Sequence, residues 1–234
     1  LQGLIDKDTI LYPKHEYLVT NPFIVEGANL IIKPGVTIRF GNDELTGQRG
    51  RINLFRNSSG KNSEIIAEGT KDSLIKFLPD TYNNSYTEIS FDNNGRNSAS
   101  NSICDWCYFE KMHVIYAPKI SNSQFFDAGA YGGSIEYSNF IQSNGYLYIQ
   151  GGWKYSNIAD FDDYGNWQSM YYTANKINVV GWMKGDGDYI GNYRSWKPTG
   201  FYAQSGIQEF KNTYLGTGSV DILKELNIDA FDGN

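Results

Sequence analysis

Two groups of aspartate residues have the residue type and spacing that acid–base or metal chemistry would need. Asp160, Asp162 and Asp163 lie in the stretch DFDDYGN, and Asp186 and Asp188 lie in GDGDY further along the chain. Two carboxylates held about 5–10 Å apart can divide the roles of general acid and general base. The first group, together with backbone carbonyls, is also a weak candidate for a Ca²⁺ site. The alternative is that these aspartates are solvated side chains in Asp- and Gly-rich loops.

A second set of candidates consists of aromatic residues in the same part of the chain. Four tryptophans follow one another at steps of 14, 15 and 14 residues, with two tyrosines among them: Trp153, Trp167, Trp182 and Trp196, with Tyr171 and Tyr193. A row of exposed rings beside amide and carboxylate groups can stack on sugar rings and hydrogen-bond their hydroxyl groups. These six residues form the predicted ligand-binding set, and carbohydrate is the expected ligand. The alternative is that the rings cover long loops or contact a partner domain.

The histidines and cysteines give weaker signals. His15 and His113 stand apart from each other, and neither accompanies a serine or cysteine in a recognisable nucleophile motif. Cys104 and Cys107 form a single C-x-x-C pair in CDWC. This pair lacks the second ligand pair of a zinc site and the βαβ context of a redox motif. We therefore expect no bound cofactor here, and we expect Cys107 to be a small structural residue.

The composition indicates an all-β protein that is not a nucleic-acid binder. The 234 residues include 25 glycines, 18 tyrosines and 13 phenylalanines, a mixture of turn residues and strand-forming aromatics. The net charge is −6 and the Lys and Arg residues are scattered, which disfavours nucleic acid and anionic membranes as partners. No apolar stretch approaches the ~20 residues needed to span a bilayer.

A weak internal repeat indicates how the strands follow one another. A small or polar residue is followed two positions later by a bulky one, at steps of 15 to 20 residues. The seven matches are Cys107-Tyr108-Phe109, Ser123-Gln124-Phe125, Ser138-Asn139-Phe140, Ser156-Asn157-Ile158, Asn175-Lys176-Ile177, Asn192-Tyr193-Arg194 and Asn212-Thr213-Tyr214. Residues two apart share one face of a strand. Stacked coils would therefore place the small residues in one inward column and the large residues in another, as in a solenoid.

The stretch NLIIKPGVTIRF, residues 29–40, interrupts a strong strand pattern with Pro34-Gly35. Pro34 fixes φ and donates no hydrogen bond, and Gly35 can adopt positive φ. We expect the chain to turn a corner there, so that the strands on either side lie on different faces of one coil.

These residues resemble the opening coils of the right-handed parallel β-helix, or pectate-lyase-like, superfamily, in the form found in bacterial surface and secreted proteins. The matching positions are Gly27, Leu30, Ile32, Pro34, Gly35, Val36, Ile38 and Phe40, followed by Ala67, Gly69, Thr70, Ile75 and Phe77. The resemblance covers about a third of the chain. It implies a single domain over residues 1–234, with an N-terminal cap and first strand in 1–28, coils in 29–215 and a C-terminal cap in 216–234. The cap would be a short helix with Ser219 as its N-cap residue.

The resemblance also bears on function. It implies an extracellular or cell-surface location and a chain that is part of a larger protein, whose other domains would be partners. Carbohydrate-cleaving relatives use Asp-bound calcium with a basic residue, or a constellation of carboxylates, and those motifs are not recognisable here. The expected role is therefore a non-catalytic binding or display module, glycan-binding or adhesive. A polysaccharide lyase or glycoside hydrolase that uses the five aspartates, and a structural stalk, remain the alternatives.

Overall fold

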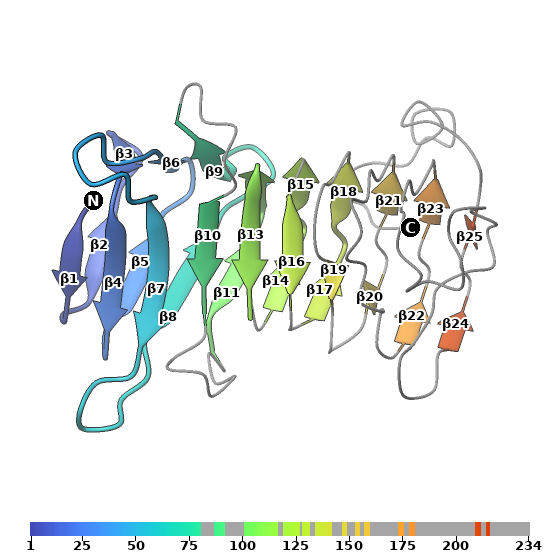
Figure 1. Ribbon diagram of the computed structural model, residues 1–234. Coiled ribbons are helices and arrows are strands. Elements are labelled where there is room, and N and C mark those ends of the chain that lie inside the picture. Colours follow the sequence, from blue (N-terminus) through green and yellow to red (C-terminus); the bar gives the residue numbers. More distant parts are fainter. Residues whose placement is uncertain are drawn as a thin grey trace. The chain divides into compact units, whose positions relative to one another are not determined.

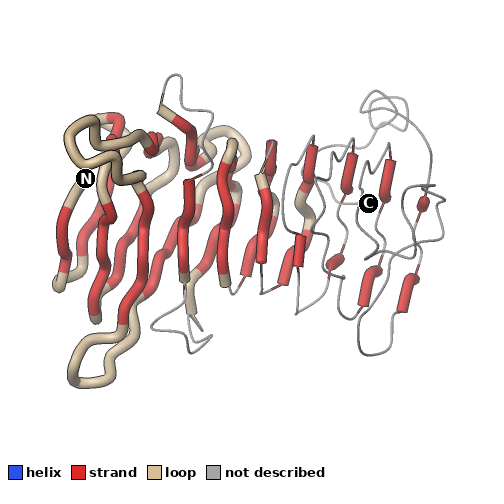
Figure 2. The backbone as a smooth tube through the Cα atoms, viewed as in Figure 1, coloured by secondary structure: helices blue, strands red, loops and turns tan. Residues whose placement is uncertain are grey.

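The structure is a computed structural model that describes residues 1–80, 87–91, 101–116, 119–126, 128–131, 134–141, 147–148, 153–154, 157–159, 173–175, 178–180, 209–211 and 214–215. The chain divides into two compact units, residues 1–119 and 120–234, and each is described by itself. The described residues form strands, turns and loops without an α-helix (Figure 2). None of them belongs to a helix that is long and apolar enough to cross a membrane.

Unit 1 consists of three parallel sheets, named A, B and C. Sheet A contains, in order, β1 (Gly3–Ile5), β4 (Pro22–Glu26), β7 (Arg51–Phe55), β10 (Thr87–Ser90) and β13 (Met112–Ile115). Sheet B contains β2 (Thr9–Leu11), β5 (Asn29–Ile32), β8 (Glu64–Glu68) and β11 (Ile103–Asp105). Sheet C contains β3 (Glu16–Val19), β6 (Thr37–Phe40), β9 (Ile75–Pro79) and β12 (Cys107–Glu110). Figure 1 shows these strands in blue to green.

The path of the chain through these sheets defines a parallel β-helix. Strands β1, β2 and β3 belong to sheets A, B and C in turn, and β4 then returns to sheet A, where it pairs in parallel with β1. The same cycle repeats, and each strand pairs with the strand one coil later in its own sheet. The prediction of an all-β solenoid is therefore confirmed.

Unit 2 has the same arrangement of parallel strands. Its sheet A pairs β16 (Gly129–Tyr131) with β19 (Leu147–Tyr148). Its sheet B contains β17 (Ser134–Glu136), β20 (Trp153–Lys154), β22 (Thr173–Asn175) and β24 (Glu209–Lys211). Its sheet C contains β15 (Gln124–Phe126), β18 (Asn139–Ile141), β21 (Asn157–Ala159), β23 (Asn178–Val180) and β25 (Tyr214–Leu215). Strand β14 (Lys119–Ser121) contains the boundary between the units.

Alternating side chains fill the interior of unit 1. In β6 the side chains of Ile38 and Phe40 are fully buried, whereas those between and before them are only half-buried. Because the side chains of a strand alternate between its two faces, each strand of this kind contributes one face to the core. Ile38, Phe77 and Phe109 are register partners in sheet C. The rings of Phe77 and Phe109 are stacked, with centroids 5.0 Å apart and planes at 4°.

The corner predicted at Pro34-Gly35 is present between β5 and β6. Gly35 has φ of 82°, and the backbone N–H of Val36 donates to the carbonyl oxygen of Lys33 at 3.2 Å. Proline at the second position and a positive-φ glycine at the third are the signature of a type II turn. The stretch that raised the expectation of a corner therefore folds as predicted.

Later coils turn from sheet B to sheet C at a single residue with positive φ. These corner residues are Trp106 (φ 51°) between β11 and β12, Asn122 (φ 49°) between β14 and β15, and Tyr137 (φ 50°) between β17 and β18. Non-glycine residues rarely adopt this conformation, and asparagine does so more readily than tryptophan or tyrosine. The corner is therefore imposed by the stacked strands on either side and not by glycine.

The inward column of small residues is confirmed where the structure describes it. Cys107, Ser123 and Ser138 are all fully buried, and so are Phe109 and Phe125, the bulky partners of the first two. The serine hydroxyls are satisfied locally: Ser123 Oγ donates to Ser121 O at 2.7 Å, and Ser138 Oγ donates to Glu136 O at 2.8 Å. Small polar residues are thus accepted in the interior because each hydroxyl donates to a carbonyl at the corner.

The later part of the predicted repeat is wrong in register. Asn175 lies in β22 of sheet B, where its partner is Lys154, and not in sheet C. In sheet C the partner of Ile158 is Val179, and Val179 is in turn paired with Leu215. β23 thus pairs directly with β25. The predicted match at Asn192 lies outside the described residues. Asparagine occurs at both 175 and 178 in ANKINVV. Each is followed two positions later by an aliphatic residue, so spacing alone does not show which asparagine begins the strand of sheet C.

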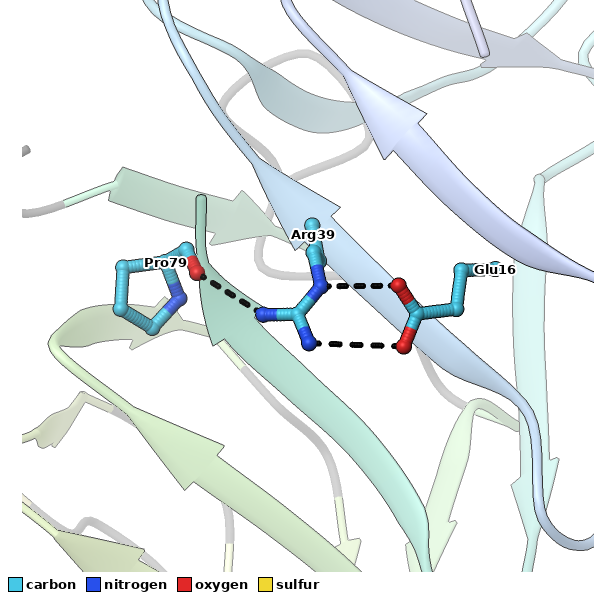
Figure 3. A network of polar contacts seen from close by, with 3 residues as sticks. All are labelled: Glu16, Arg39 and Pro79. Atoms are coloured by element: carbon cyan, nitrogen blue, oxygen red, sulfur yellow. Dashed lines mark hydrogen bonds and ion pairs between the residues drawn. The ribbon is translucent and has the colours of Figure 1, made fainter. Parts of the chain in front are cut away.

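A polar network on the outer face of sheet C joins three successive coils of unit 1 (Figure 3). Arg39 Nε donates to Glu16 Oε2 at 3.0 Å, and Arg39 Nη2 donates to Glu16 Oε1 at 3.4 Å. Arg39 Nη1 also donates to the carbonyl oxygen of Pro79 at 3.5 Å. The guanidinium therefore bridges β3, β6 and β9, and it lowers the pKa of the Glu16 carboxyl.

The predicted domain organisation is not decided by the described residues. Residues 1–28 contain β1 to β4, and β1, β2 and β3 already pair with strands of the next coil. The capping helix predicted from Ser219 and the rest of 216–234 lie outside the described residues. The single domain, its cap boundaries and its place in a larger protein stay predictions.

Candidate functional site

The predicted aspartates lie in two long connections of unit 2. Asp160, Asp162 and Asp163 fall in the connection from β21 to β22, residues 160–172, and Asp186 and Asp188 fall in the connection from β23 to β24, residues 181–208. All five aspartates are outside the described residues. Their roles as acid, base or calcium ligands stay predictions.

Five of the six predicted ligand-binding aromatics belong to the same two connections. Trp167 and Tyr171 are in the first, and Trp182, Tyr193 and Trp196 are in the second. They too lie outside the described residues. The sixth, Trp153, is in β20, where its register partners are Ile135 and Ala174.

The strands that flank these two connections are register partners at both ends. The first connection follows Ala159 and the second follows Val180, and these two residues are partners in sheet C. The first connection leads into Thr173 and the second leads into Glu209, and these residues are partners in sheet B. Neighbouring strands of a sheet are about 4.8 Å apart. Two chain segments that are rich in aromatic residues and that contain the predicted aspartates are therefore anchored at neighbouring strands.

A second polar site, on the outer face of sheet A in unit 1, was not predicted from the sequence. Arg51, Glu88 and His113 are register partners on β7, β10 and β13. They point away from the core, because the next residue of each strand, Ile52, Ile89 or Val114, is buried. The neighbouring outward column has polar residues at two of these coils, Asn53 and Ser90. Five polar side chains thus share one face over three coils.

Burial shifts the proton affinities of two of these groups. Glu88 is half-buried, and this burial raises the pKa of its carboxyl, although the positive charge of Arg51 acts in the opposite direction. His113 is also half-buried, and burial lowers the pKa of its imidazole. A carboxyl that holds its proton more tightly beside an imidazole that holds its proton less tightly is suited to general acid–base chemistry.

The sequence signal for this pairing was present but dispersed. Glu88 and His113 each precede an inward apolar residue, in the stretches TEIS and MHVI. The pairing becomes visible only when Ile89 and Val114 are aligned as register partners. His113, which looked isolated in the sequence, therefore has a carboxylate residue as its neighbour on the adjacent strand.

The cysteines have the structural character that was predicted for Cys107. Cys104 and Cys107 are both buried, and neither forms a disulfide within the part of the chain that the structure describes. Cys107 Sγ donates to the carbonyl oxygens of Asp105 at 3.4 Å and Ala67 at 3.7 Å. Burial is the main cause that raises the pKa of the Cys107 thiol well above its usual range. A protonated, enclosed thiol is a poor nucleophile and a poor metal ligand.

Tyr108 on sheet C is a further titratable group, and its hydroxyl is engaged by a neighbouring side chain of the same strand. Tyr108 Oη donates to Glu110 Oε2 at 3.3 Å. Burial, together with the nearby carboxylate, raises the pKa of Tyr108 to about 12. Among the described residues, no three His, Cys, Asp or Glu side chains are grouped so that they could hold a metal ion.

Comparison with known proteins gives no relative: no protein-family model, curated protein or solved structure matches the chain. Its function is therefore argued from the fold and the residues alone.

Proposed function

We propose that the chain is a non-catalytic β-helix module of the pectate-lyase-like type that binds glycans outside the cell or at the cell surface. The observation that carries this proposal is the pair of connections anchored at Ala159 and Val180, and again at Thr173 and Glu209. Both connections are rich in tryptophan and tyrosine, and they contain three and two aspartates respectively. Aromatic rings on a rigid scaffold can stack on sugar rings, and carboxylates beside them can accept hydrogen bonds from hydroxyl groups.

A parallel β-helix suits such a role because it separates scaffold from site. The inward residues of successive coils stabilise one another, and the connections between strands can then vary in length and sequence without loss of the core. The family assignment is supported by the fold and by the opening motif that ends at Phe40 and Phe77, both of which are fully buried. Other domains of a larger surface protein are the further partners we propose.

Binding to a glycan array tests the proposal. The wild-type chain is expected to bind a subset of glycans, and Trp182→Ala is expected to weaken this binding by about tenfold or more, the effect of losing one stacked aromatic anchor. Tyr12→Ala is the matched control, because Tyr12 is 51% exposed and lies in unit 1. If neither carbohydrate binding nor a difference between the two variants is found, the module is not a glycan binder, and the structural stalk is favoured.

Cleavage of an acidic polysaccharide by a lyase or hydrolase is the second candidate, and one described feature favours it. Glu88 and His113 are neighbours on the outer face of sheet A, with the pKa of the carboxyl raised and that of the imidazole lowered. Incubation with a polysaccharide panel, followed by measurement of reducing ends and unsaturated uronates, tests it. Turnover that is lost in Glu88→Gln and His113→Gln would place an enzyme on sheet A. Turnover that is lost in Asp162→Ala would place it in the connections of unit 2.

A further inference from the structure

A strip of isoleucine side chains crosses the outer face of sheet B in unit 1. Ile10, Ile31, Ile66 and Ile103 are register partners on the four strands β2, β5, β8 and β11. Ile10 is 41% exposed and the other three are half-buried. Their neighbours Leu30, Ile65 and Cys104 point inward and are buried. We call these four residues the isoleucine strip.

The isoleucine strip differs from the corresponding outer columns of the other two sheets. On sheet A the outward column runs Leu4, Ile24, Asn53, Ser90 and Ile115, so it is polar at the third and fourth coils. On sheet C the outward column alternates between leucine and a charged residue, as Leu18, Arg39 and Leu78. Sheet B has an isoleucine at this outward position in all four strands from β2 to β11, whereas the columns of the other two sheets are interrupted by polar or charged residues. Strand propensity alone does not explain this, because all three sheets have the same requirement for β-formers.

Carboxylates border the isoleucine strip on both sides. Of the charged residues in or directly beside its four strands, Asp8, Glu64, Glu68 and Asp105 are acidic and Lys33 is the one base. On one side the acids are fixed by amides: Asp8 Oδ1 accepts from the backbone N–H of Asn29 at 2.9 Å, and Glu64 Oε1 accepts from Asn101 Nδ2 at 2.9 Å. An apolar strip with a polar, charged border is the usual composition of a protein-binding surface.

The geometry and charge of this surface define its occupant. It is the face of a sheet and not an edge, so the backbone of the sheet offers no hydrogen bonds, and a partner must satisfy its own backbone groups. An α-helix does so. Side chains along one face of a helix recur about every 5.4 Å, close to the spacing of about 4.8 Å between neighbouring strands. Side chains on one face of a strand recur at roughly 6.6 Å and would fall out of step with the isoleucines.

We propose that the isoleucine strip is the docking site for an amphipathic helix of a partner protein, and that this helix has a row of aliphatic side chains flanked by Lys and Arg. The basic flanks would lie against Asp8 and Glu64 on one side and Glu68 and Asp105 on the other. A second copy of this chain does not fit the site, because like-charged borders would then face each other. The docking site consists of residues of unit 1, whereas the aromatic connections belong to unit 2, so this proposal rests on different residues from the proposed carbohydrate binding.

Binding of a designed peptide tests this docking site. The probe is a basic amphipathic peptide of about 18 residues, long enough to form a helix, with leucine along one face and lysine on both flanks. The control peptide has the same leucines and glutamate in place of lysine. Titration of the complete chain, followed by calorimetry or fluorescence anisotropy, is expected to show saturable binding of the basic peptide, weakened by added salt, and at least about tenfold weaker binding of the acidic peptide.

Matched variants separate the isoleucine strip from non-specific attraction to an acidic protein. The double variant Ile31→Thr/Ile66→Thr keeps β-branched residues on both strands and is expected to weaken binding by about tenfold. Ile24→Thr makes the same change at a half-buried outward position of sheet A and is expected to leave binding unchanged. Glu64→Gln/Glu68→Gln is expected to reduce the salt dependence. Circular dichroism and thermal unfolding of each variant show whether the fold is retained.

A direct footprint covers the case in which a variant fails to fold. Carbodiimide labelling of the wild-type chain is expected to be reduced at Glu68 by the bound basic peptide and to be unchanged at Glu26 on sheet A. Equal binding of both peptides, equal loss in Ile24→Thr, or protection at Glu26 instead of Glu68 would overturn the proposal. Self-association of the free chain that disappears in Ile31→Thr/Ile66→Thr would also overturn it, because the strip would then be an interface between copies.

Discussion

Replacement of Phe109 tests whether the stacked interior is the main source of stability. The Phe109 side chain is fully buried and its ring is stacked on that of Phe77 at a centroid distance of 5.0 Å. Truncation of a buried phenylalanine to alanine removes its transfer free energy and leaves a cavity, at a cost of about 3–5 kcal/mol. Loss of the ring pair accounts for roughly 0.5–1.5 kcal/mol of this. We therefore expect Phe109→Ala to lower the free energy of unfolding by about 3–5 kcal/mol.

Urea unfolding followed by circular dichroism measures this change, with Phe55→Ala as the control. Phe55 is half-buried on the outer face of sheet A, so its truncation removes less apolar surface from a protected environment, and we expect a loss below roughly 2 kcal/mol. The stack itself is measured by a double-mutant cycle with Phe77→Leu and Phe109→Leu, for which a coupling of about 0.5–1.5 kcal/mol is expected. A cost for Phe109→Ala of less than about 1 kcal/mol, or no greater than that of Phe55→Ala, would refute the stacked-interior argument.

Two further predictions concern single polar groups of unit 1. Thr87 is buried, and its hydroxyl has no hydrogen-bond partner among the residues that the structure describes. The isosteric change Thr87→Val should therefore raise the free energy of unfolding by about 1 kcal/mol, whereas the same change at the half-buried Thr37 should not. A destabilised Thr87→Val in urea unfolding would contradict this. Burial lowers the pKa of His113, so the unfolded chain binds a proton more readily, and stability present above pH ~6.5 is lost as the pH falls towards the folded-state pKa. His113→Gln should therefore lose less stability than wild type between about pH 7 and pH 5. The control is His15→Gln, at an exposed position, which should follow wild type. Identical pH profiles for His113→Gln and wild type would count against the burial of a neutral imidazole.

Local patterns were sufficient to predict the corner and the strands around it. Pro34 and Gly35 restrict the backbone by their own covalent structure, and the type II turn forms where they occur. The alternation of Leu30, Ile32, Ile38 and Phe40 likewise requires only that neighbouring side chains of a strand point to opposite faces. These features depend on a few adjacent residues, so they can be derived without knowledge of the rest of the chain.

Register was harder to predict, because it depends on which coils are neighbours. The triplet that begins at Asn175 has the expected spacing, yet the residue opposite Ile158 is Val179. Hydrogen bonding to β21 determines which residues of β23 lie opposite Ile158. Spacing along the sequence does not determine this alignment, because the connections between consecutive strands differ in length. A spacing rule that works for Cys107, Ser123 and Ser138, where coils are short, therefore fails once longer connections intervene.

The outward-facing surfaces were the least visible in the sequence. Ile31 and Ile66 lie in the apolar runs NLII and EIIA, where an outward isoleucine cannot be told from its inward neighbours by hydropathy. Glu88 and His113 are separated in the chain by the rest of a coil, which includes β11 and β12, and their spacing gives no indication that they are partners. Composition and spacing, in contrast, are sufficient to predict the aromatic and aspartate set, and the structure adds the positions of the strands that flank its two connections.

The sequence by itself determined that the chain forms short strands, that it turns at Pro34-Gly35, and that bulky and small residues such as Phe109 and Cys107 face inward. These follow from steric limits on the backbone and from the exclusion of apolar side chains from water, which act on each segment separately. The tertiary structure alone decided that Glu88 lies beside His113 and that four isoleucines form one strip. The physical reason is that a residue on the outer face of a coil acquires its neighbours from the coils before and after it, and hydrogen bonding between those coils sets the alignment.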